Sequence, residues 1–377
     1  MRAAAAAVLL LAAAAAAAQG PAVSHAPEIP PLPATPPPIE SILAVDEEMR
    51  AFAAELRRKS TTPKDRLDEL VHALLDRRGL GIRYGERATL TASQTFTART
   101  GNCISFTNLF VALARELGFR AYFSEVDQII AQDQRGEMIV NNKHMYATVE
   151  IENGWYHVDF GQEAGGYQLV NRVSDRRAAA HYYNNLGAEL LVQARAERAV
   201  PFFERAVELE PELAEAWLNQ GVAHRRLGQP ERAEACYREA ARLDGSELPA
   251  LWNLSLLLDE QGRAAEAEET RAKVESYKNQ SPFHHFNLGV EAVRTGQMEE
   301  AVRRFRQAIR RAPREPELHF ALGDAYYRLG DTARALSSMR RALALADRPE
   351  KREHYHAAIQ ALERLEVAVE RTAFEQE

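Results

Sequence analysis

Three side chains in the N-terminal half could together perform acyl transfer. Cys103 lies in the stretch TGNCISFTNLFVALARELG, where the pattern predicts that a helix begins, and His144 and Asp159 follow it in the chain. The start of a helix offers partial positive charge and free amides, which favour a thiolate and can bind an oxyanion. An imidazole can take the thiol proton, and a carboxylate can fix the tautomer of that imidazole. Gln94, upstream of Cys103, is a candidate side-chain donor to the same oxyanion.

Each of these residues also has a simpler explanation. A single cysteine on an apolar stripe is usually a core residue. His144, His157 and Asp159 could instead share one face of a hairpin and bind a metal, but the sequence has no HExxH or CxxC pattern, and we expect no metal and no cofactor. His284 and His285 are neighbours on a predicted helix, where adjacent side chains diverge by about 100°, so they form a poor ligand pair.

A small α+β region has to position these groups. Helical periodicity covers residues 42–56 and 63–77, and the segment after Cys103 has an apolar helical stripe that ends before Gly118. The following AYFSEV predicts a strand, and HMYATVEIENGWYHVDF predicts a β-hairpin that turns around Glu-Asn-Gly. A helix followed by antiparallel strands indicates an α+β domain.

The register of this hairpin decides whether His144 and Asp159 can meet. Apolar residues alternate on both strands, and they share one buried face only if the loop has an even number of residues. A turn at Asn-Gly would put Asp159 opposite Thr148, about 13 Å along the strand from His144. A register shifted by two, through a turn at Glu-Asn or a four-residue loop, puts Asp159 opposite Tyr146 and diagonal to His144. We predict the shifted register, because a catalytic triad of Cys103, His144 and Asp159 requires it.

These motifs resemble the transglutaminase-like cysteine fold. The similarity lies in a G-N-C motif that ends at Cys103 and in the hairpin pattern formed by His144, Trp155 and Asp159, and it covers about residues 85–165. The resemblance implies that Cys103 is the nucleophile, His144 its base and Asp159 the residue that orients His144. It implies acyl transfer through a thioester but not cross-linking, because relatives include proteases, amidases and inactive copies.

The C-terminal half is an internal repeat with a constant period. Small residues recur at the centre of five similar stretches, namely Gly187, Gly221, Ser255, Gly289 and Gly323. At a fixed distance after each of them come Phe203, Tyr237, Arg271, Phe305 and Met339. The pattern resembles the tetratricopeptide repeat, in which two antiparallel helices pack closely and units stack into a solenoid. We count five repeats over about residues 180–347, of which the third departs most.

By this resemblance the first helix of each repeat lines a concave inner face. The repeat phase places asparagines at one equivalent position, with aromatic and arginine side chains nearby: Asn185, Asn219, Asn253, Asn287, Trp252, Phe286, Phe320, Arg225 and Arg294. An amide both donates and accepts, so a row of asparagines could bind an extended peptide backbone. Asparagine could also simply be common at this repeat position. We expect a protein or peptide partner on this face.

The N-terminal segment 1–18 predicts export. One arginine is followed by an apolar run and small residues before Gln19, which is typical of a secretory signal peptide. The alternative is a membrane anchor, but the run of about 16 residues is shorter than the ~20 that a spanning helix needs. We expect cleavage, no membrane span afterwards, and a periplasmic or secreted bacterial protein. The proline-rich residues that follow predict an extended or disordered spacer.

The formal net charge of −7 gives no reason to expect nucleic-acid binding. The two cysteines, Cys103 and Cys236, could pair in an exported protein, but they fall in different segments and we expect two free thiols. Cys236 precedes an aromatic repeat residue and is expected to be structural.

The expected fold class is an α+β transglutaminase-like, cysteine-protease-type domain followed by an all-α repeat solenoid. The predicted segments are a signal peptide at 1–18, a spacer at 19–40, the transglutaminase-like domain at 41–178, five repeats at 179–347, and a capping helix and tail at 348–377. Two functions follow as hypotheses. The chain is an exported thiol enzyme whose solenoid binds a protein or peptide, or it is an inactive interaction scaffold of the cell envelope.

Overall fold

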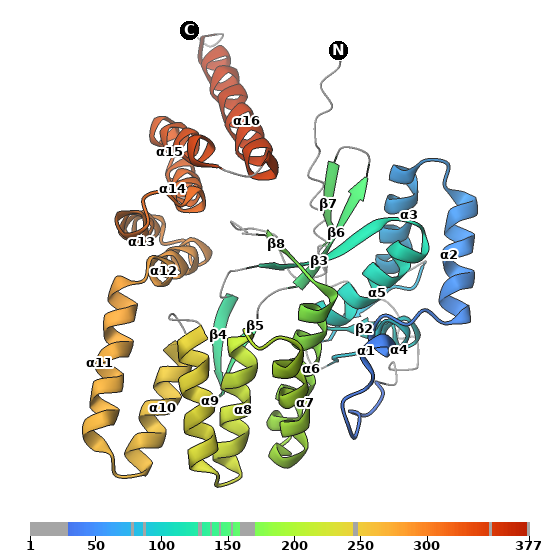
Figure 1. Cartoon of the computed structure of the whole chain (residues 1–377). Helices are drawn as coiled ribbons and strands as arrows, with labels where there is room; N and C mark the ends of the chain where they lie inside the picture. The colour runs from blue at the N-terminus through green and yellow to red at the C-terminus, as the bar shows by residue number, and fades with distance from the viewer. Residues whose placement is uncertain are drawn as a thin grey trace, which may run out of the picture. The chain divides into compact units, whose positions relative to one another are not determined.

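The computed structural model describes residues 29–76, 79–85, 88–126, 130–135, 138–142, 145–151, 154–158, 170–243, 248–346 and 349–374. These residues belong to two compact units that meet in the chain between Arg271 and Ala272 (Figure 1). The first unit contains the α+β region and the repeats up to Arg271, and the second contains the repeats that follow and the C-terminal helix. Among the described helices, none is both long and apolar enough to cross a membrane.

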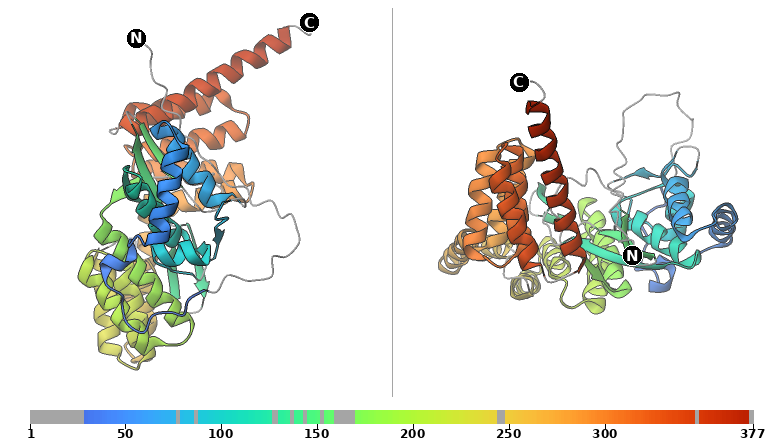
Figure 2. Two further views of the ribbon diagram at one scale, coloured as in Figure 1. Left: turned by 90° about the vertical axis from the view of Figure 1, so that its right-hand side faces the viewer. Right: turned by 90° about the horizontal axis from the view of Figure 1, so that it is seen from above.

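The first unit begins with a helical layer. Its helices are α1 (Ile39–Ile42), α2 (Glu47–Lys59), α3 (Pro63–Leu75), α4 (Ala92–Ala98) and α5 (Cys103–Glu116). Asp46 and Thr62 cap α2 and α3 by accepting hydrogen bonds from Met49 N and Asp65 N. α2 and α3 lie side by side (Figure 2). Two short parallel strands, β1 (Arg83–Tyr84) and β2 (Thr100–Gly101), precede α5.

A four-stranded antiparallel sheet packs on α5. Its order is β7-β6-β3-β8, with β3 (Arg120–Val126), β6 (Met145–Ile151), β7 (Gly154–Val158) and β8 (Val170–Val173). The apolar face of β6 shares one core with the stripe of α5, as alternation predicts. A separate hairpin is formed by β4 (Ile130–Arg135) and β5 (Met138–Asn142).

The described pairs of β6 and β7 have the shifted register. Ala147 pairs with Val158 and Ile151 with Gly154, so two residues separate the strands. The prediction of the shifted register, with its two-residue Glu-Asn alternative, is therefore confirmed for these pairs.

Ten helices after β8 form five successive helical repeats, followed by one long helix. They are α6 (Asp175–Val192), α7 (Ala196–Leu209), α8 (Ala214–Arg226), α9 (Pro230–Leu243), α10 (Leu248–Glu260), α11 (Ala264–Gln280), α12 (Pro282–Arg294), α13 (Met298–Arg311), α14 (Pro316–Arg328) and α15 (Thr332–Leu345), and then α16 (Pro349–Phe374). The predicted fold class, an α+β domain followed by an all-α solenoid, is confirmed.

The repeating small residue is required by close helix packing. A Cβ placed on Gly187 would lie 2.6 Å from the ring of Phe203, and one on Gly221 would lie 2.6 Å from the ring of Tyr237. The glycine of the first helix therefore makes room for the aromatic residue of the second. The constant phase of the sequence reflects this contact.

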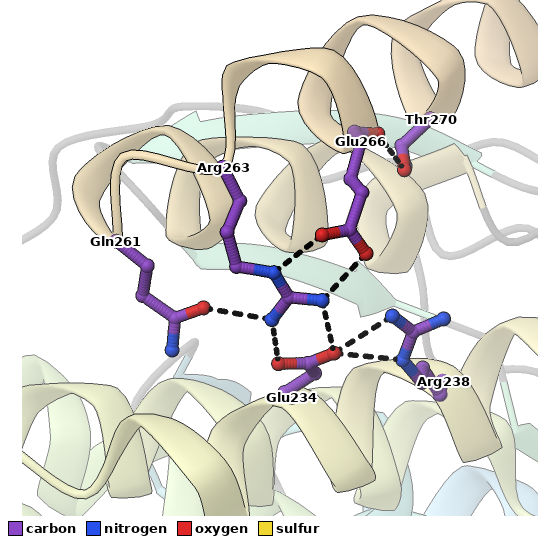
Figure 3. A network of polar contacts seen from close by, with 6 residues as sticks. All are labelled: Glu234, Arg238, Gln261, Arg263, Glu266 and Thr270. Carbon is purple, nitrogen blue, oxygen red and sulfur yellow. Dashed lines mark hydrogen bonds and ion pairs between the residues drawn. The ribbon is translucent and has the colours of Figure 1, made fainter.

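In the third repeat, an ion pair takes the place of this contact. Ser255 stands at the glycine position and is buried, whereas Arg271 stands at the aromatic position and forms an ion pair with Asp259 at 2.6 Å. Arg263, which directly precedes α11, forms ion pairs with Glu234 of α9 and with Glu266 of α11, each at 2.6 Å (Figure 3). The division into two units falls directly after Arg271.

The described part of the proline-rich segment lies on the first repeat. Residues 29–38 have no regular secondary structure, as their composition predicts. The Tyr183 hydroxyl donates to the carbonyl of Pro37 at 2.6 Å, and Arg198 Nη2 donates to the carbonyl of Pro33 at 3.2 Å. We call residues 29–38 the proline arm. It is an attached element of the first unit.

Candidate active site

Cys103 is the first residue of α5. Asn102 caps the helix, because its side-chain oxygen accepts from Ser105 N at 3.1 Å, and the Cys103 side chain is partly exposed. Of the first amides of α5, those of Cys103 and Ile104 have no acceptor among the described residues. A partly exposed thiol therefore lies beside two available donors, which is the arrangement that an oxyanion needs.

Gly101 and Asn102, the first two residues of the G-N-C motif, each have a structural role. A Cβ on Gly101 would lie 2.6 Å from Cβ of Ser105, so only glycine lets the chain approach α5 this closely. Asn102 is buried, and besides its capping oxygen it uses its amide nitrogen to donate to Thr89 Oγ1 at 2.7 Å. The residues before Cys103 thus hold the start of α5 in place.

The first turn of α5 lies against the beginning of β6. Thr107 Oγ1 lies 2.8 Å from the carbonyl oxygen of Cys103 and 3.1 Å from that of Met145. Met145 is the residue after His144 in the sequence. His144 and Asp159, the predicted base and orienting group, lie outside the described residues.

His157 belongs to a polar group within the sheet. Its Nδ1 lies 2.9 Å from Thr148 Oγ1, and that hydroxyl lies 2.6 Å from Ser124 Oγ. Thr148 and Ser124 are buried. This nitrogen of His157 is therefore engaged in cross-strand hydrogen bonding, which offers a structural role for a residue considered above as a metal ligand.

Gln94, the candidate oxyanion donor, closes a capping box on α4. Its side-chain oxygen accepts from Thr91 N at 3.0 Å, and its backbone N donates to Thr91 Oγ1 at 3.3 Å. Sequence reasoning missed this use of Gln94, although the T-x-x-Q spacing before a short helix is a recognisable signal.

The two cysteines differ in environment. Both are free thiols, as expected. Cys236 is 6% exposed, and burial raises the pKa of its thiol to about 12, so the thiol stays protonated at neutral pH. Cys236 is therefore an inert packing residue and supplies an internal control for the reactivity of Cys103.

The asparagine row is only partly on the surface. Asn219 and Asn253 are buried, whereas Asn185 and Asn287 are partly exposed. Asn219 donates to Asn184 Oδ1 at 2.9 Å, one residue before the predicted member of the row. Neither the nitrogen nor the oxygen of the Asn253 amide has a hydrogen-bond partner within the described chain.

The aromatic residues predicted around the groove have different positions. Trp252 is 44% exposed, as a binding residue requires. Phe286 and Phe320 are instead buried in the core of the second unit, where Phe286 packs on Phe305 and Phe320 on Tyr355. Phe286 and Phe320, predicted to lie around the groove, are therefore packing residues, because the repeat phase gives a position on the helix but not the side chains that cover it.

The two predicted arginines are engaged in ion pairs. Arg225 Nη2 lies 2.5 Å from Glu260 Oε1, and Arg294 Nη2 lies 2.5 Å from Glu291 Oε1. Arg294 is exposed and its partner is on the same helix, so this pair can open at little cost. Arg225 joins α8 to α10 and supports the stacking of the second and third repeats.

The contact between the first repeat and the α+β region was not foreseen. Arg177 of α6 donates to both carboxylate oxygens of Glu125 on β3, at 2.7 and 3.3 Å, and Glu125 is 2% exposed. Glu189 of α6 accepts from Thr89 N at 3.0 Å. No pattern in the sequence relates residues so far apart.

Known families match both parts of the chain. Residues 50–160 match the transglutaminase-like superfamily, and residues 180–213, 214–246 and 286–350 match tetratricopeptide repeats. These matches agree with the fold described above.

Individual relatives are distant. The human protein O-mannosyl-transferase TMTC3 is 24% identical over 245 residues, which are 63% of this chain and 27% of that protein. The uncharacterized protein MJ0572 of Methanocaldococcus jannaschii is 38% identical over 58 residues, which are 15% of this chain and 67% of that protein. Among solved structures, MamA of Desulfovibrio magneticus RS-1 from residue 41 aligns with 46% of this chain and 96% of its own, at 20% identity and a TM-score of 0.26. The chain thus spans about a quarter of the human relative.

Proposed function

Because the chain joins a transglutaminase-like domain to tetratricopeptide repeats, we propose that it is an exported thiol-dependent acyl-transfer enzyme whose repeats bind a protein or peptide substrate. One observation carries the proposal of activity. Thr107 ties the first turn of α5 to the carbonyl of Met145, so the thiol-bearing end of the helix lies beside the residue that follows His144. A cysteine that served only the core would need neither this location nor its exposure.

The hairpin register supports the third member of the triad. The residue pairs that the structure describes between β6 and β7 end at Ala147 and Val158. We expect the same register, continued by one residue, to put Asp159 opposite Tyr146, where it is a diagonal neighbour of His144. Diagonal residues in a sheet lie about 7–8 Å apart at the backbone, which side chains can bridge.

In the proposed reaction, Cys103 Sγ attacks the carbonyl carbon of an amide while His144 takes the thiol proton. The C–N bond breaks, His144 returns this proton to the leaving amine, and a thioester remains on Cys103. Water or a second amine then attacks the thioester, gives a proton to His144, and releases the thiol, which regains the proton. The available amides of Cys103 and Ile104 are placed to bind the oxyanion in both steps.

The decisive experiment is alkylation of the intact protein by iodoacetamide at pH 6. We expect Cys103 to be labelled, because the proposed base His144 takes its proton and makes it a reactive nucleophile. Cys236 is not labelled, because its pKa of about 12 keeps it protonated. Cys103→Ala should abolish labelling, and Cys236→Ala should leave it unchanged.

Activity is tested with the same variants. Cys103→Ala should remove any amidase or transamidase turnover while leaving the repeats folded. Full turnover by Cys103→Ala on a validated substrate would contradict the assignment. A Cys103 that is as unreactive as Cys236 would favour the alternative function, an inactive interaction scaffold.

We also propose that the row of asparagines binds an extended peptide. Asn185 and Asn287 are partly exposed and accessible to a peptide, whereas the Asn253 amide and the Asn219 oxygen have no partner among the described residues but are buried beneath the surface. Replacing Asn185, Asn253 and Asn287 by alanine should weaken a peptide partner more than it lowers stability. A large loss of stability with unchanged binding would favour a purely structural role.

Export is proposed from segment 1–18 alone. N-terminal sequencing of protein recovered from a bacterial periplasm or culture medium should begin at Gln19 or close to it. Recovery of the full-length chain in the membrane fraction would instead favour an anchor.

A further inference from the structure

The segment Ala88–Leu90 joins the start of α5 to the first repeat. On one side, Asn102 N and Ser105 Oγ both donate to the Ala88 carbonyl, at 3.1 and 2.6 Å. Leu90 N donates to Ser105 Oγ at 2.8 Å. On the other side, Thr89 N donates to Glu189 Oε1 of α6 at 3.0 Å.

A continuous chain of hydrogen bonds therefore runs from the first repeat to the helix cap. Glu189 accepts from Thr89 N, Thr89 Oγ1 accepts from Asn102 Nδ2 at 2.7 Å, and Asn102 Oδ1 accepts from Ser105 N at 3.1 Å. Thr89 is 3% exposed, Asn102 is 6% and Ser105 is fully buried. Water does not readily replace bonds between groups that are this deeply buried.

A cavity lies beside the first link of this chain. It measures about 380 Å³ and is lined by the proline arm, by Thr89 and Thr91, by Glu189 of α6 and by Gln193, which follows α6. The hydrogen bond from Thr89 N to the Glu189 carboxylate therefore borders this cavity. The links closer to Cys103 are enclosed.

We infer that Glu189 is a positioning residue of the acyl-transfer site, through which the first repeat holds the nucleophile helix in its reactive position. This inference rests on the proposed function of Cys103. Glu189 does not touch the reacting atoms. It fixes Thr89, Thr89 fixes Asn102, and Asn102 orders the first turn of α5, whose available amides face the oxyanion and whose dipole favours the thiolate.

The assignment has a consequence for the organisation of the chain. The repeats do more than present a substrate, because the first of them completes the support of the nucleophile. Ile104, the residue after Cys103, also belongs to the core of the repeats. We expect the α+β region alone, without α6 and α7, to have a poorly reactive Cys103.

The test is the rate of iodoacetamide alkylation of Cys103 between pH 6 and 9 in the full chain, with Cys236→Ala as background. Glu189→Ala should slow alkylation by about fivefold, the factor that corresponds to loss of one helix cap. Glu189→Gln should stay within about twofold of the background rate, because the amide oxygen still accepts from Thr89 N. Gln193→Ala, which changes the wall of the same cavity, is the matched control.

The two variants of Glu189 separate positioning from charge. If Glu189 acted as a negative charge near the thiolate, both substitutions would raise the alkylation rate by similar factors at every pH at which the Cys103 thiol is not fully ionised. Equal rates for Glu189→Gln and Glu189→Ala would therefore overturn the inference, as would an unchanged rate in Glu189→Ala. Thr89→Val removes the hydroxyl that accepts from Asn102 Nδ2 but keeps the backbone bond to Glu189, and it should slow alkylation as Glu189→Ala does. It replaces Glu189→Ala in the test if that variant does not fold.

A second readout separates this inference from the proposed function. Hydrogen exchange at the amides of Ser105 and Phe106 should be faster in Glu189→Ala and normal in Glu189→Gln. If Cys103 of the background protein does not react, the proposed function fails, and the exchange rates still decide whether Glu189 positions the start of α5. Unchanged exchange in Glu189→Ala would refute the positioning role.

Discussion

Removal of one partner of the ion pair between Arg177 and Glu125 should strongly destabilise the first unit. Glu125 is 2% exposed and Arg177 donates to both of its carboxylate oxygens. Burial lowers the pKa of Arg177, but the hydrogen bonds to Glu125 and the charges of Glu215 and Glu210 outweigh it, and the net pKa is raised. Arg177→Met keeps an unbranched apolar stem and leaves the Glu125 charge in place without this partner.

We expect Arg177→Met to lower the free energy of unfolding by about 3 kcal/mol at pH 7. Removal of one member of a buried pair typically costs ~3–5 kcal/mol. The lower figure applies here, because the Arg177 side chain is 24% exposed and His181 Nε2 lies 3.5 Å from Glu125 Oε2. The double variant Arg177→Met/Glu125→Gln should recover most of the loss, since no buried charge remains.

Urea unfolding followed by tryptophan fluorescence measures this effect selectively. The three tryptophans, Trp155, Trp217 and Trp252, all precede Arg271, so their fluorescence reports the first unit. Arg242→Met is the matched control, because Arg242 pairs with Glu239 on the surface and should unfold like the wild type. A loss below about 1 kcal/mol in Arg177→Met, or a double variant no more stable than the single one, would refute the reasoning.

Three further outcomes follow from particular contacts. Gly221→Ala should lower stability by ~1–3 kcal/mol in the same urea assay, because its Cβ would lie 2.6 Å from the Tyr237 ring; an unchanged midpoint would mean that the helices can separate freely. Tyr183→Phe should cost ~1 kcal/mol and make the proline arm more sensitive to proteolysis, because the bond to the Pro37 carbonyl is lost; equal cleavage rates would show that the arm is held by other contacts. Asn253→Leu should leave stability equal or slightly higher while it weakens a peptide partner in a fluorescence titration, because the buried amide has no partner in the described chain; a marked destabilisation would contradict this.

Local chemistry and periodicity predicted much of the fold. The constant period located the repeats, because the contact of Gly221 with Tyr237 recurs in the first and fourth repeats, and in the fifth with Met339 in place of the aromatic residue. Alternation of apolar residues restricted the β6–β7 hairpin to a few registers, and the pairing of Ala147 with Val158 confirms the shifted one. The predicted start of α5 at Cys103 is also confirmed.

Features that depend on distant segments could not be predicted. Asn219 bonds to Asn184 and not to the Asn185 of the predicted row, because the rotation of one helix against the next decides which neighbour is in reach. Phe320 is a core residue, because α16 covers it, and no pattern in the sequence sets that covering. Composition predicted an extended or disordered spacer, but the attachment of the proline arm depends on Tyr183, far along the chain from Pro37.

The charged third repeat has a consequence for how the protein unfolds. In a solenoid, cooperativity passes only between neighbouring repeats, so one weak interface can divide a single transition into two. The third repeat is where the usual aromatic contact between its two helices is replaced by the pair of Arg271 with Asp259, and the first unit ends at Arg271, within α11. We therefore expect the third repeat to lose its structure before its neighbours at intermediate urea. The first unit contains Cys103, the proline arm and the contacts of α6 with the α+β region. Proteolytic loss of the repeats beyond this boundary would leave a shorter protein in which the thiol site and its support are intact.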